Sequence, residues 1–295
     1  YPKMITCDEN YNLNNENLVE ITPEIDDENY ECSYNLTIDS NKWFFYWATN
    51  TTDNDLIINP PETAYDNYQN HGLIKSNDEG NIKIFLNCPQ VYKDKKQTYC
   101  RHFHYLTESN DKTWNSLKTI RIICKVKYNY LLEKTKNLTC IIINALPEEY
   151  YEKEHIPNSI NLSYKSLKKI PTISKEKKII KFLKDNLDKY PKINDLVLSN
   201  KLNIKDIPII TYCANSECDA SAQLIDHLYE CKINNVLEWE GGMKEWNEIN
   251  KTPLFDDAED EDQDEEEKEK EKEKEKLDSS SSEDDTSSSD EEDEY

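Results

Sequence analysis

The sequence contains no run of 18 apolar residues, and this absence predicts that no helix spans a membrane. Its nine cysteines include no pair in CxxC spacing, so a zinc site is not expected. Basic residues are in deficit, because 36 Lys and Arg stand against 60 Asp and Glu, and no basic excess can replace the counterions of phosphate groups. We therefore expect a protein that binds neither a membrane nor nucleic acid.

The negative charge is concentrated at the end of the chain. From Asp256 to Tyr295 there are 23 acidic residues against 5 lysines, which accounts for −18 of the net −24. The Glu/Lys alternation over Glu267–Lys276 and the serine blocks after it offer almost nothing to bury, so residues 256–295 are predicted to be a disordered acidic tail. Its serines, which precede acidic residues, are in a context suited to phosphorylation. The tail is either a docking segment for protein partners or a solubilising appendage.

The compartment stays open between secreted and cytoplasmic. The chain begins with Tyr1 rather than methionine, which is compatible with removal of a leader. Six of the nine cysteines lie in the first 140 residues, a distribution that suits disulfides in a secreted protein and equally suits reduced core cysteines.

Residues 1–132 are predicted to form a mainly β, sandwich-like domain of unknown role. Short alternating segments such as Asn81–Leu86 are separated by Asn- and Asp-rich turns, which is typical of antiparallel β structure. The aromatic run Trp43–Trp47 is expected to fill the core. From His71 to Tyr105 the order is strand, Gly-containing turn, strand, Pro-Tyr loop and strand. This stretch distantly resembles the β-sandwich modules of transthyretin-like proteins and intradiol dioxygenases.

His102 and His104 alternate along the last of these strands and therefore face the same side, where two imidazoles could bind a metal. The alternative is the polar face of an edge strand. Because no acidic or tyrosine ligand stands at a recognisable spacing, we expect no metal and no other cofactor.

From Asn137 the pattern changes to strands alternating with helices, which predicts a parallel sheet covered on both faces. Apolar runs predict strands at Leu138–Asn144, Ile207–Tyr212 and Asn235–Trp239. Helices are predicted at Pro147–Lys153, Lys175–Tyr190 and Ala220–Cys231. The predicted fold class is therefore α/β, with a parallel-sheet domain at residues 133–255 between the mainly β domain and the tail.

Three segments of this region carry a resemblance. They are "CIIINALPEEYYEKEHIPNSINLSY" at residues 140–164, "PIITYCANSECDASAQLIDHLYE" at 208–230 and "NVLEWEGGMKEWNE" at 235–248. In this order they resemble the rhodanese-like domain of the sulfurtransferase superfamily, over about residues 137–255. The resemblance implies that Cys213 is the catalytic nucleophile. It would take a sulfane sulfur from a donor such as thiosulfate, and a thiol acceptor would then discharge the persulfide.

The position of Cys213 gives this chemistry a physical basis. A cysteine at the carboxyl end of a parallel strand, followed by a loop and a helix amino terminus, lies among backbone N–H groups that lower its pKa and hold an anion. The loop predicted to form this anion cradle consists of Ala214, Asn215, Ser216, Glu217, Cys218 and Asp219.

The loop departs from the family pattern. Many active relatives have glycine and arginine here, whereas this loop has Glu217 and Asp219 and no cation. These carboxylates oppose both a thiolate and an anionic donor, so a neutral or protein-bound sulfur donor is favoured over thiosulfate. Phosphatase relatives need an arginine six residues after the cysteine, where Asp219 stands, so phosphatase activity is not expected.

Three functions remain open. The leading one is a single-domain sulfurtransferase that uses Cys213, and its rival is a catalytically inactive interaction module. The third is a thiol redox switch in which Cys218 acts as a resolving thiol. His155 and Trp246 are expected to be structural, and Asn158 stands where relatives have a glycine, at a turn where asparagine tolerates positive φ.

Overall fold

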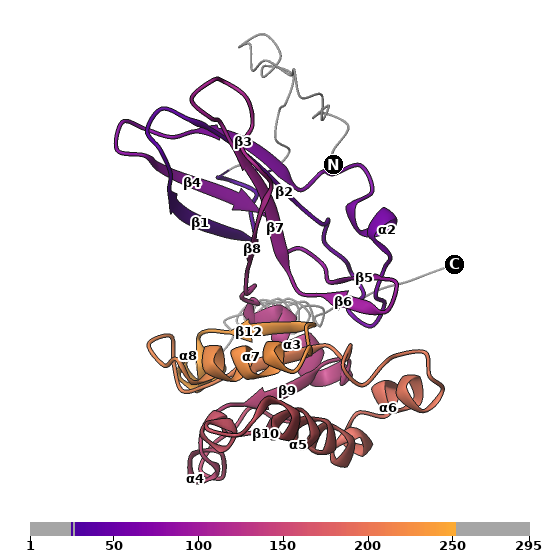
Figure 1. The fold of residues 1–295 in the computed structure, drawn as a ribbon. Helices are drawn as coiled ribbons and strands as arrows, with labels where there is room; N and C mark the ends of the chain where they lie inside the picture. The colour runs from indigo at the N-terminus through magenta and orange to yellow at the C-terminus, as the bar shows by residue number, and fades with distance from the viewer. Residues whose placement is uncertain (1–24, 26, 252–295) are drawn as a thin grey trace, which may run out of the picture. The chain divides into compact units, whose positions relative to one another are not determined.

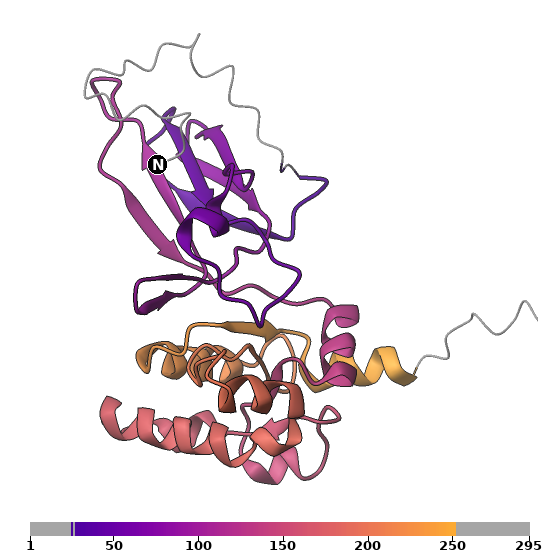
Figure 2. The same cartoon turned by 90° about the vertical axis from the view of Figure 1, so that its right-hand side faces the viewer.

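The computed structural model describes Ile25 and residues 27–251, and its first unit ends at Asn247. The predicted acidic tail and Cys7 lie outside the described residues. Antiparallel strands come first along the unit, and a parallel sheet with its helices follows (Figures 1 and 2). The α/β fold class, with antiparallel β structure preceding it, is confirmed.

The β-rich region consists of antiparallel pairs. Its largest sheet has the order β3-β2-β7-β8, formed by His71–Lys75, Trp43–Ala48, His102–Thr107 and Lys118–Arg121. A second sheet pairs β1 (Cys32–Thr37) with β4 (Asn81–Leu86), and a short pair joins β5 (Tyr92–Asp94) to β6 (Gln97–Tyr99). The short helix α2 (Pro61–Tyr65) lies between β2 and β3 in the chain.

Aromatic side chains connect the β3-β2-β7-β8 sheet to the β1–β4 pair. Phe44 and Phe45 of β2 are fully buried, as the aromatic run predicts. The Tyr46 hydroxyl donates to the carbonyl oxygen of Phe85 in β4 over 3.1 Å. The β1–β4 pair therefore packs against the larger sheet in a sandwich-like arrangement.

The parallel sheet has the strand order β10-β9-β11-β12, formed by Ile160–Asn161, Ile141–Asn144, Ile209–Tyr212 and Val236–Trp239. Tyr212 lies opposite Asn144 on one side and Trp239 on the other. Since these three strands end level, the residues that follow them meet at one edge of the sheet.

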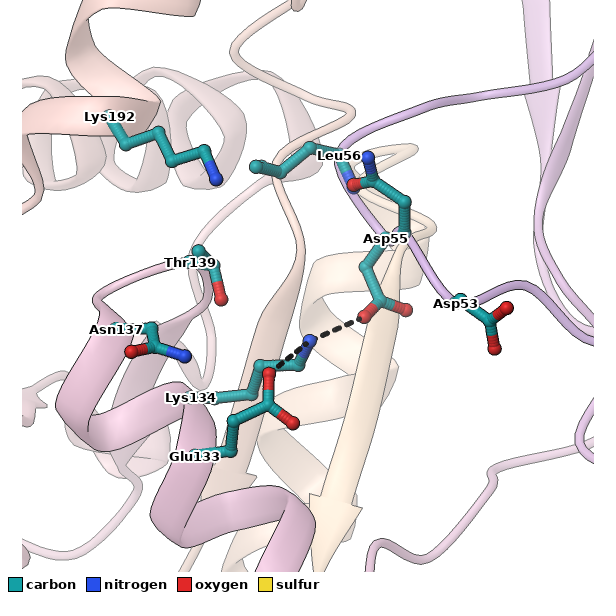
Figure 3. A pocket seen from close by; sticks show the side chains of 9 residues that line it. Asp53, Asp55, Leu56, Glu133, Lys134, Asn137, Thr139 and Lys192 are labelled. Carbon is teal, nitrogen blue, oxygen red and sulfur yellow. Dashed lines mark hydrogen bonds and ion pairs between the residues drawn. The ribbon is translucent and has the colours of Figure 1, made fainter.

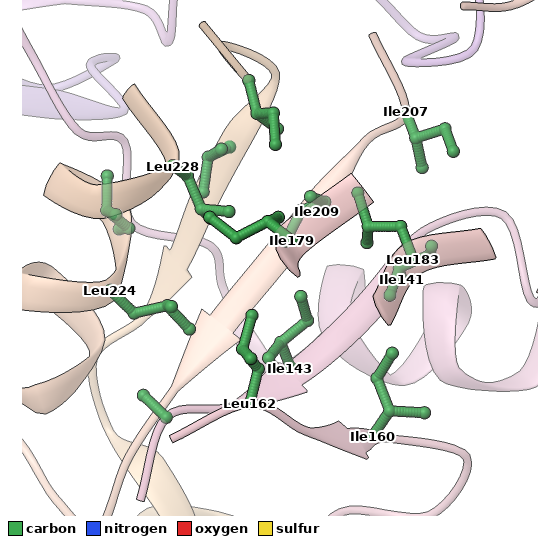
Figure 4. Close-up of a cluster of buried hydrophobic side chains, with 14 of the residues drawn as sticks. Ile141, Ile143, Ile160, Leu162, Ile179, Leu183, Ile207, Ile209, Leu224 and Leu228 are labelled. Carbon is green, nitrogen blue, oxygen red and sulfur yellow. The ribbon is translucent and has the colours of Figure 1, made fainter. Parts of the chain in front are cut away.

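One face of this sheet is covered by α5 (Thr172–Asp185) and α7 (Ala220–Glu230), and Figure 4 shows the buried aliphatic side chains between these layers. Each fully buried Ile or Leu contributes about 1.5–3 kcal/mol. On the other face, the ring of Tyr128 in α3 (Tyr128–Asn137) lies 6.4 Å from Trp239 and 5.5 Å from Trp246 of α8 (Gly242–Lys251). The remaining helical segments are α4 (Glu148–Tyr151), η1 (Tyr164–Leu167), η2 (Leu187–Lys189) and α6 (Pro191–Leu198).

Two predicted elements differ from the structure by three residues or more, for local reasons, and the other predicted boundaries differ by two residues at most. The first parallel strand begins at Ile141 rather than at Leu138, because Leu138 takes a φ of 53° as the left-handed cap of α3. The helix predicted at Lys175–Tyr190 begins after Pro171 and ends at Asp185. The rest of that segment forms the separate turn η2, and Pro191 then starts α6.

The structure contains a disulfide between Cys88 and Cys124, residues that the sequence left open between oxidised and reduced states. The segment after Cys124 runs beside β12, since Glu238 donates its amide to the carbonyl of Cys124 over 3.0 Å. None of the helices in the described residues has the length and apolar character that crossing a membrane requires.

Candidate functional site

Cys213 follows β11 directly, at the edge where the parallel strands end. Its side chain is 1% exposed and belongs to the core cluster shared with α7. The thiol is therefore closed off from solvent.

The thiol of Cys213 faces hydrogen-bond acceptors. It donates to the carbonyl oxygen of Cys218 over 3.0 Å, and the carbonyl of Asn215 lies 3.7 Å away. Burial raises the pKa of the thiol to about 11, the Cys218 thiol adds to the rise, and hydrogen bonds from Ser221 lower the pKa. The resting form at neutral pH is therefore the protonated thiol.

In the loop predicted as an anion cradle, backbone amides form hydrogen bonds within the loop. Asn215 accepts the amide of Glu217 on its side chain over 3.0 Å and the amide of Cys218 on its carbonyl over 3.1 Å. The side chains of Ser216, Glu217 and Asp219 are exposed, while Ala214, Asn215 and Cys218 are half-buried. Two amides of the predicted cradle thus already have partners inside the loop.

Behind Cys213 lie two buried polar side chains that the sequence did not single out. The hydroxyl of Ser221, in the first turn of α7, lies 3.6 Å from the Cys213 sulfur and donates to the carboxylate of Glu238 in β12. Ser221 is 1% exposed and Glu238 is 8% exposed. A carboxylate is rarely buried unless it is hydrogen-bonded, so this contact fixes both side chains.

The Gly-Gly pair of the third segment closes the site from the side of α8. The amide of Met243 donates to the carbonyl of Cys213 over 3.0 Å, and that of Lys244 to the carbonyl of Ala214 over 2.9 Å. Gly242 has a φ of +60°, and a Cβ atom there would come within 2.6 Å of the Cys213 carbonyl oxygen. The close approach of α8 to the Cys213 backbone therefore requires glycine.

The turn after α4 is structural, as the sequence predicts. Asn158 has a φ of 62°, and the His155 ring stacks on Tyr151 at 4.2 Å. The hydroxyl of Tyr212 accepts the amide of Ile156 over 3.0 Å, which ties this turn to the strand that precedes Cys213.

Residues 127–249 match the family model of the rhodanese-like domain. The chain contains a rhodanese-like domain. No match was found among curated proteins. Among solved structures, the N-terminal domain of a protein from Clostridium difficile 630 that is described as ATP/GTP-binding matches with 23% sequence identity, covering 43% of this chain and 99% of that chain at a TM-score of 0.26. A TM-score this low supports no inference about this chain.

The match begins ahead of the resemblance read from the sequence and takes in α3, whose Tyr128 packs on Trp239 and Trp246. Trp246, the tryptophan of the Gly-Gly segment, is therefore a packing residue of the rhodanese-like domain. His227 is also engaged within the domain, since the ammonium of Lys175 lies 3.0 Å from its Nδ1.

Outside the rhodanese-like domain, His102 and His104 converge on one hydroxyl. The Tyr65 oxygen lies 3.0 Å from Nε2 of His104 and 3.5 Å from Nε2 of His102. His102 donates its Nδ1 proton to the carbonyl of Cys100 over 2.6 Å, so its Nε2 carries a lone pair. Burial lowers the pKa of both imidazoles, that of His104 to about 4, so both are neutral at pH 7. Tyr65 was missed in the sequence because it stands far from the histidines along the chain.

A cavity of about 430 Å³ is lined in part by Asp55, Lys134, Glu133 and Thr139 (Figure 3). It shares no residue with the surroundings of Cys213 or with the group of Tyr65, His102 and His104. The ammonium of Lys134 lies 3.4 Å from the Asp55 carboxylate and 3.5 Å from that of Glu133. Asp55 also accepts the Tyr130 hydroxyl, and its carboxylate lies 3.7 Å from the guanidinium of Arg101. Asp55 thus pairs with two buried cations, Lys134 and Arg101, so we assign this network to stability rather than to ligand binding.

Proposed function

We propose that the rhodanese-like domain carries sulfane sulfur as a persulfide on Cys213. The observation that carries this proposal is the position of the thiol, which follows β11 at the aligned carboxyl ends of the parallel strands, ahead of the amino terminus of α7. The family match supports the same assignment at the level of the superfamily.

The reaction balances with a persulfide donor. The Cys213 thiolate attacks the outer sulfur of R–S–SH, a new S–S bond forms to give Cys–S–SH, and R–S⁻ leaves. A thiol acceptor then removes the outer sulfur. The carboxylates of Glu217 and Asp219 and the carbonyl oxygens near the sulfur favour a neutral or protein-bound donor over thiosulfate.

Mass spectrometry of the intact, reduced protein tests the proposal. After incubation with glutathione persulfide, wild type is expected to gain about 32 Da, the mass of one sulfur, and Cys213→Ser to gain nothing at that site. Cys218→Ser is the matched control and should keep the gain, while thiosulfate should load the protein less well than glutathione persulfide. No gain with either donor would favour the interaction module, and a loss of about 2 Da that requires both cysteines would favour the redox switch. Protein partners recruited through the acidic tail stay a prediction.

A second candidate function is metal binding in the β-rich region, in place of the absence of a metal expected from the sequence. The hydroxyl of Tyr65 lies within 3.5 Å of the Nε2 atoms of both His102 and His104, so two imidazole nitrogens face one phenol oxygen, although the described residues contain no group of three or more His, Cys, Asp or Glu side chains that could hold a metal. The ring of Tyr92 lies 5.4 Å from that of Tyr65 and is the next phenol beside this group. Neutral imidazoles with one nitrogen held by a second group suit iron, copper or zinc.

Metal content after incubation with iron, copper or zinc salts and desalting checks this candidate. Wild type is expected to retain about one ion per chain, and His102→Ala/His104→Ala to retain none. His155→Ala removes an exposed imidazole elsewhere and should retain the ion. Equal retention by the double variant and wild type would contradict the assignment.

A further inference from the structure

The Cys213 thiol needs a proton acceptor. Its pKa is raised to about 11, so at neutral pH the nucleophile must be generated when a donor arrives. The loop provides carbonyl oxygens at this point, which accept a hydrogen bond but do not take up a proton.

The Ser221 hydroxyl is oriented to pass a proton on. Its own proton is donated to the Glu238 carboxylate, and its oxygen lies 3.6 Å from the Cys213 sulfur, where it can accept the thiol proton once the S–H leaves the carbonyl of Cys218. Glu238 points to the face that α7 covers, because its neighbours in β12, Leu237 and Trp239, alternate to the other face. The chain from thiol to hydroxyl to carboxylate therefore runs through the buried layer between the sheet and α7.

The other titratable groups on the elements packed around this chain lie differently. Cys218 contacts the Cys213 thiol from the loop, while the side chains of Glu217 and Asp219 are exposed. Farther along α7, Asp226 pairs with Arg121, and beside β12 Lys125 pairs with Glu240. Toward the loop, α8 presents the amides of Met243 and Lys244.

We propose that Ser221 and Glu238 form a proton relay that activates Cys213. The proposal rests on the proposed function of Cys213 and names the groups that make its thiolate. As the donor approaches, the S–H proton moves to Ser221 Oγ, and the Ser221 proton moves to Glu238. The sulfur attacks the donor as these protons move. When the acceptor thiol later removes the outer sulfur, the Cys213 thiolate is the leaving group, and the proton returns to it from Glu238 through Ser221.

Alkylation of Cys213 by iodoacetamide tests the relay without any sulfur donor. In this reaction a carbon–sulfur bond forms, iodide leaves, and the thiol proton goes to Glu238 through Ser221. The rate constant at Cys213 is measured by peptide mass spectrometry of the full chain at a series of pH values. Wild type is expected to react at a rate that changes little between about pH 7 and 9, because the carboxylate accepts the proton.

Glu238→Gln keeps the size of the side chain and removes its basicity. Its rate at pH 7 is expected to fall by about 100-fold and then to rise about tenfold per pH unit toward the pKa of the thiol. Ser221→Ala should show the same steep profile. The matched controls Glu240→Gln and Ser166→Ala change exposed side chains and should keep the wild-type profile.

A steep wild-type profile, or flat profiles in both relay variants, would overturn the relay. Packing damage alone speeds or slows alkylation at every pH and leaves the slope unchanged. If alkylation shows the flat wild-type profile while glutathione persulfide adds no sulfur, the relay holds and the proposed sulfur transfer fails. If sulfur loading depends on Cys213 while the wild-type alkylation profile is steep, the proposed sulfur transfer holds and the relay fails.

Discussion

Asp55→Ala is expected to lower the free energy of unfolding by about 3–5 kcal/mol, the usual cost of removing one partner from a buried ion pair. Asp55 is 8% exposed, and its carboxylate lies between two buried cations. Without it, the Lys134 ammonium and the Arg101 guanidinium, which are 8% and 3% exposed, would lose the anion that pairs with both of them. The Tyr130 hydroxyl would lose its acceptor as well.

The hydrogen bonds around Asp55 keep the Arg101 guanidinium from moving to solvent when Asp55 is removed. Arg101 is anchored by Asn235 at 3.1 Å and by the carbonyl of Val236 at 3.2 Å, so its guanidinium cannot turn away without breaking both bonds. Its Nε has no hydrogen-bond partner among the described residues, so the loss of Asp55 would leave an already underpaired cation. Asn235 starts the segment that leads into β12, so the damage would extend to the parallel sheet.

Thermal and urea denaturation of the oxidised protein measures the effect. A loss of about 3–5 kcal/mol corresponds to a drop in Tm of about 10 °C for a unit of this size. Asp53→Ala is the matched control, since Asp53 lines the same cavity with an exposed side chain and should change stability by less than about 0.5 kcal/mol. Equal midpoints for the two variants would show that the buried cations do not depend on Asp55.

The strands of the parallel sheet could be predicted because their sequences are continuous apolar runs. Ile141–Asn144 and Ile209–Tyr212 are buried on both faces, and that requirement leaves a direct mark on the sequence. The helix α7 was predicted almost to the residue for the same reason, since its apolar residues recur at helical spacing. In contrast, α3 was missed, because few of its residues are buried and its ring contacts with Trp239 and Trp246 leave no regular apolar stripe in the sequence.

The position of Cys213 could be predicted from the three segments, but its surroundings could not. Ser221 lies in α7 and Glu238 in β12, and only the packing of α7 against the sheet brings them together. The same applies to Tyr65 and His104. The partner of Cys88 was equally undetermined, because nine cysteines allow many pairings and spacing alone does not choose among them. Local pattern therefore predicts elements, while contacts between elements that lie far apart in the chain require the fold.

The resemblance led to the expectation that backbone amides of the loop hold an anion. In the structure, two of these amides are hydrogen-bonded within the loop instead. Asn215 takes up two loop amides, and the thiol contacts carbonyl oxygens. In a loop without a cation, this arrangement favours a protonated and protected thiol. On the proposed relay, the base that activates this thiol is the buried Glu238, which Ser221 connects to the sulfur.

Gly242→Ala is expected to destabilise the protein by about 2–5 kcal/mol and to expose Cys213. At a φ of +60° alanine is strained, and its Cβ would meet main-chain atoms of Ala214, Asn215 and Cys213 at 2.5–2.6 Å. Backbone cannot rotate away as a flexible side chain can, so α8 would have to withdraw and break the bonds from Met243 and Lys244.

Two further variants separate the causes in this region. Gly242→Asn relieves much of the φ strain but keeps the clash, so it should be nearly as unstable as Gly242→Ala. Lys244→Ala keeps the backbone bond to Ala214 and should match wild type. Urea denaturation gives the stabilities, and the rate of alkylation at Cys213, which should rise in both Gly242 variants, reports the opening of the site. If Gly242→Asn proves as stable as wild type, the strain at positive φ rather than the contact with the Cys213 backbone explains the glycine. In that case α8 would not be the element that keeps the thiol covered.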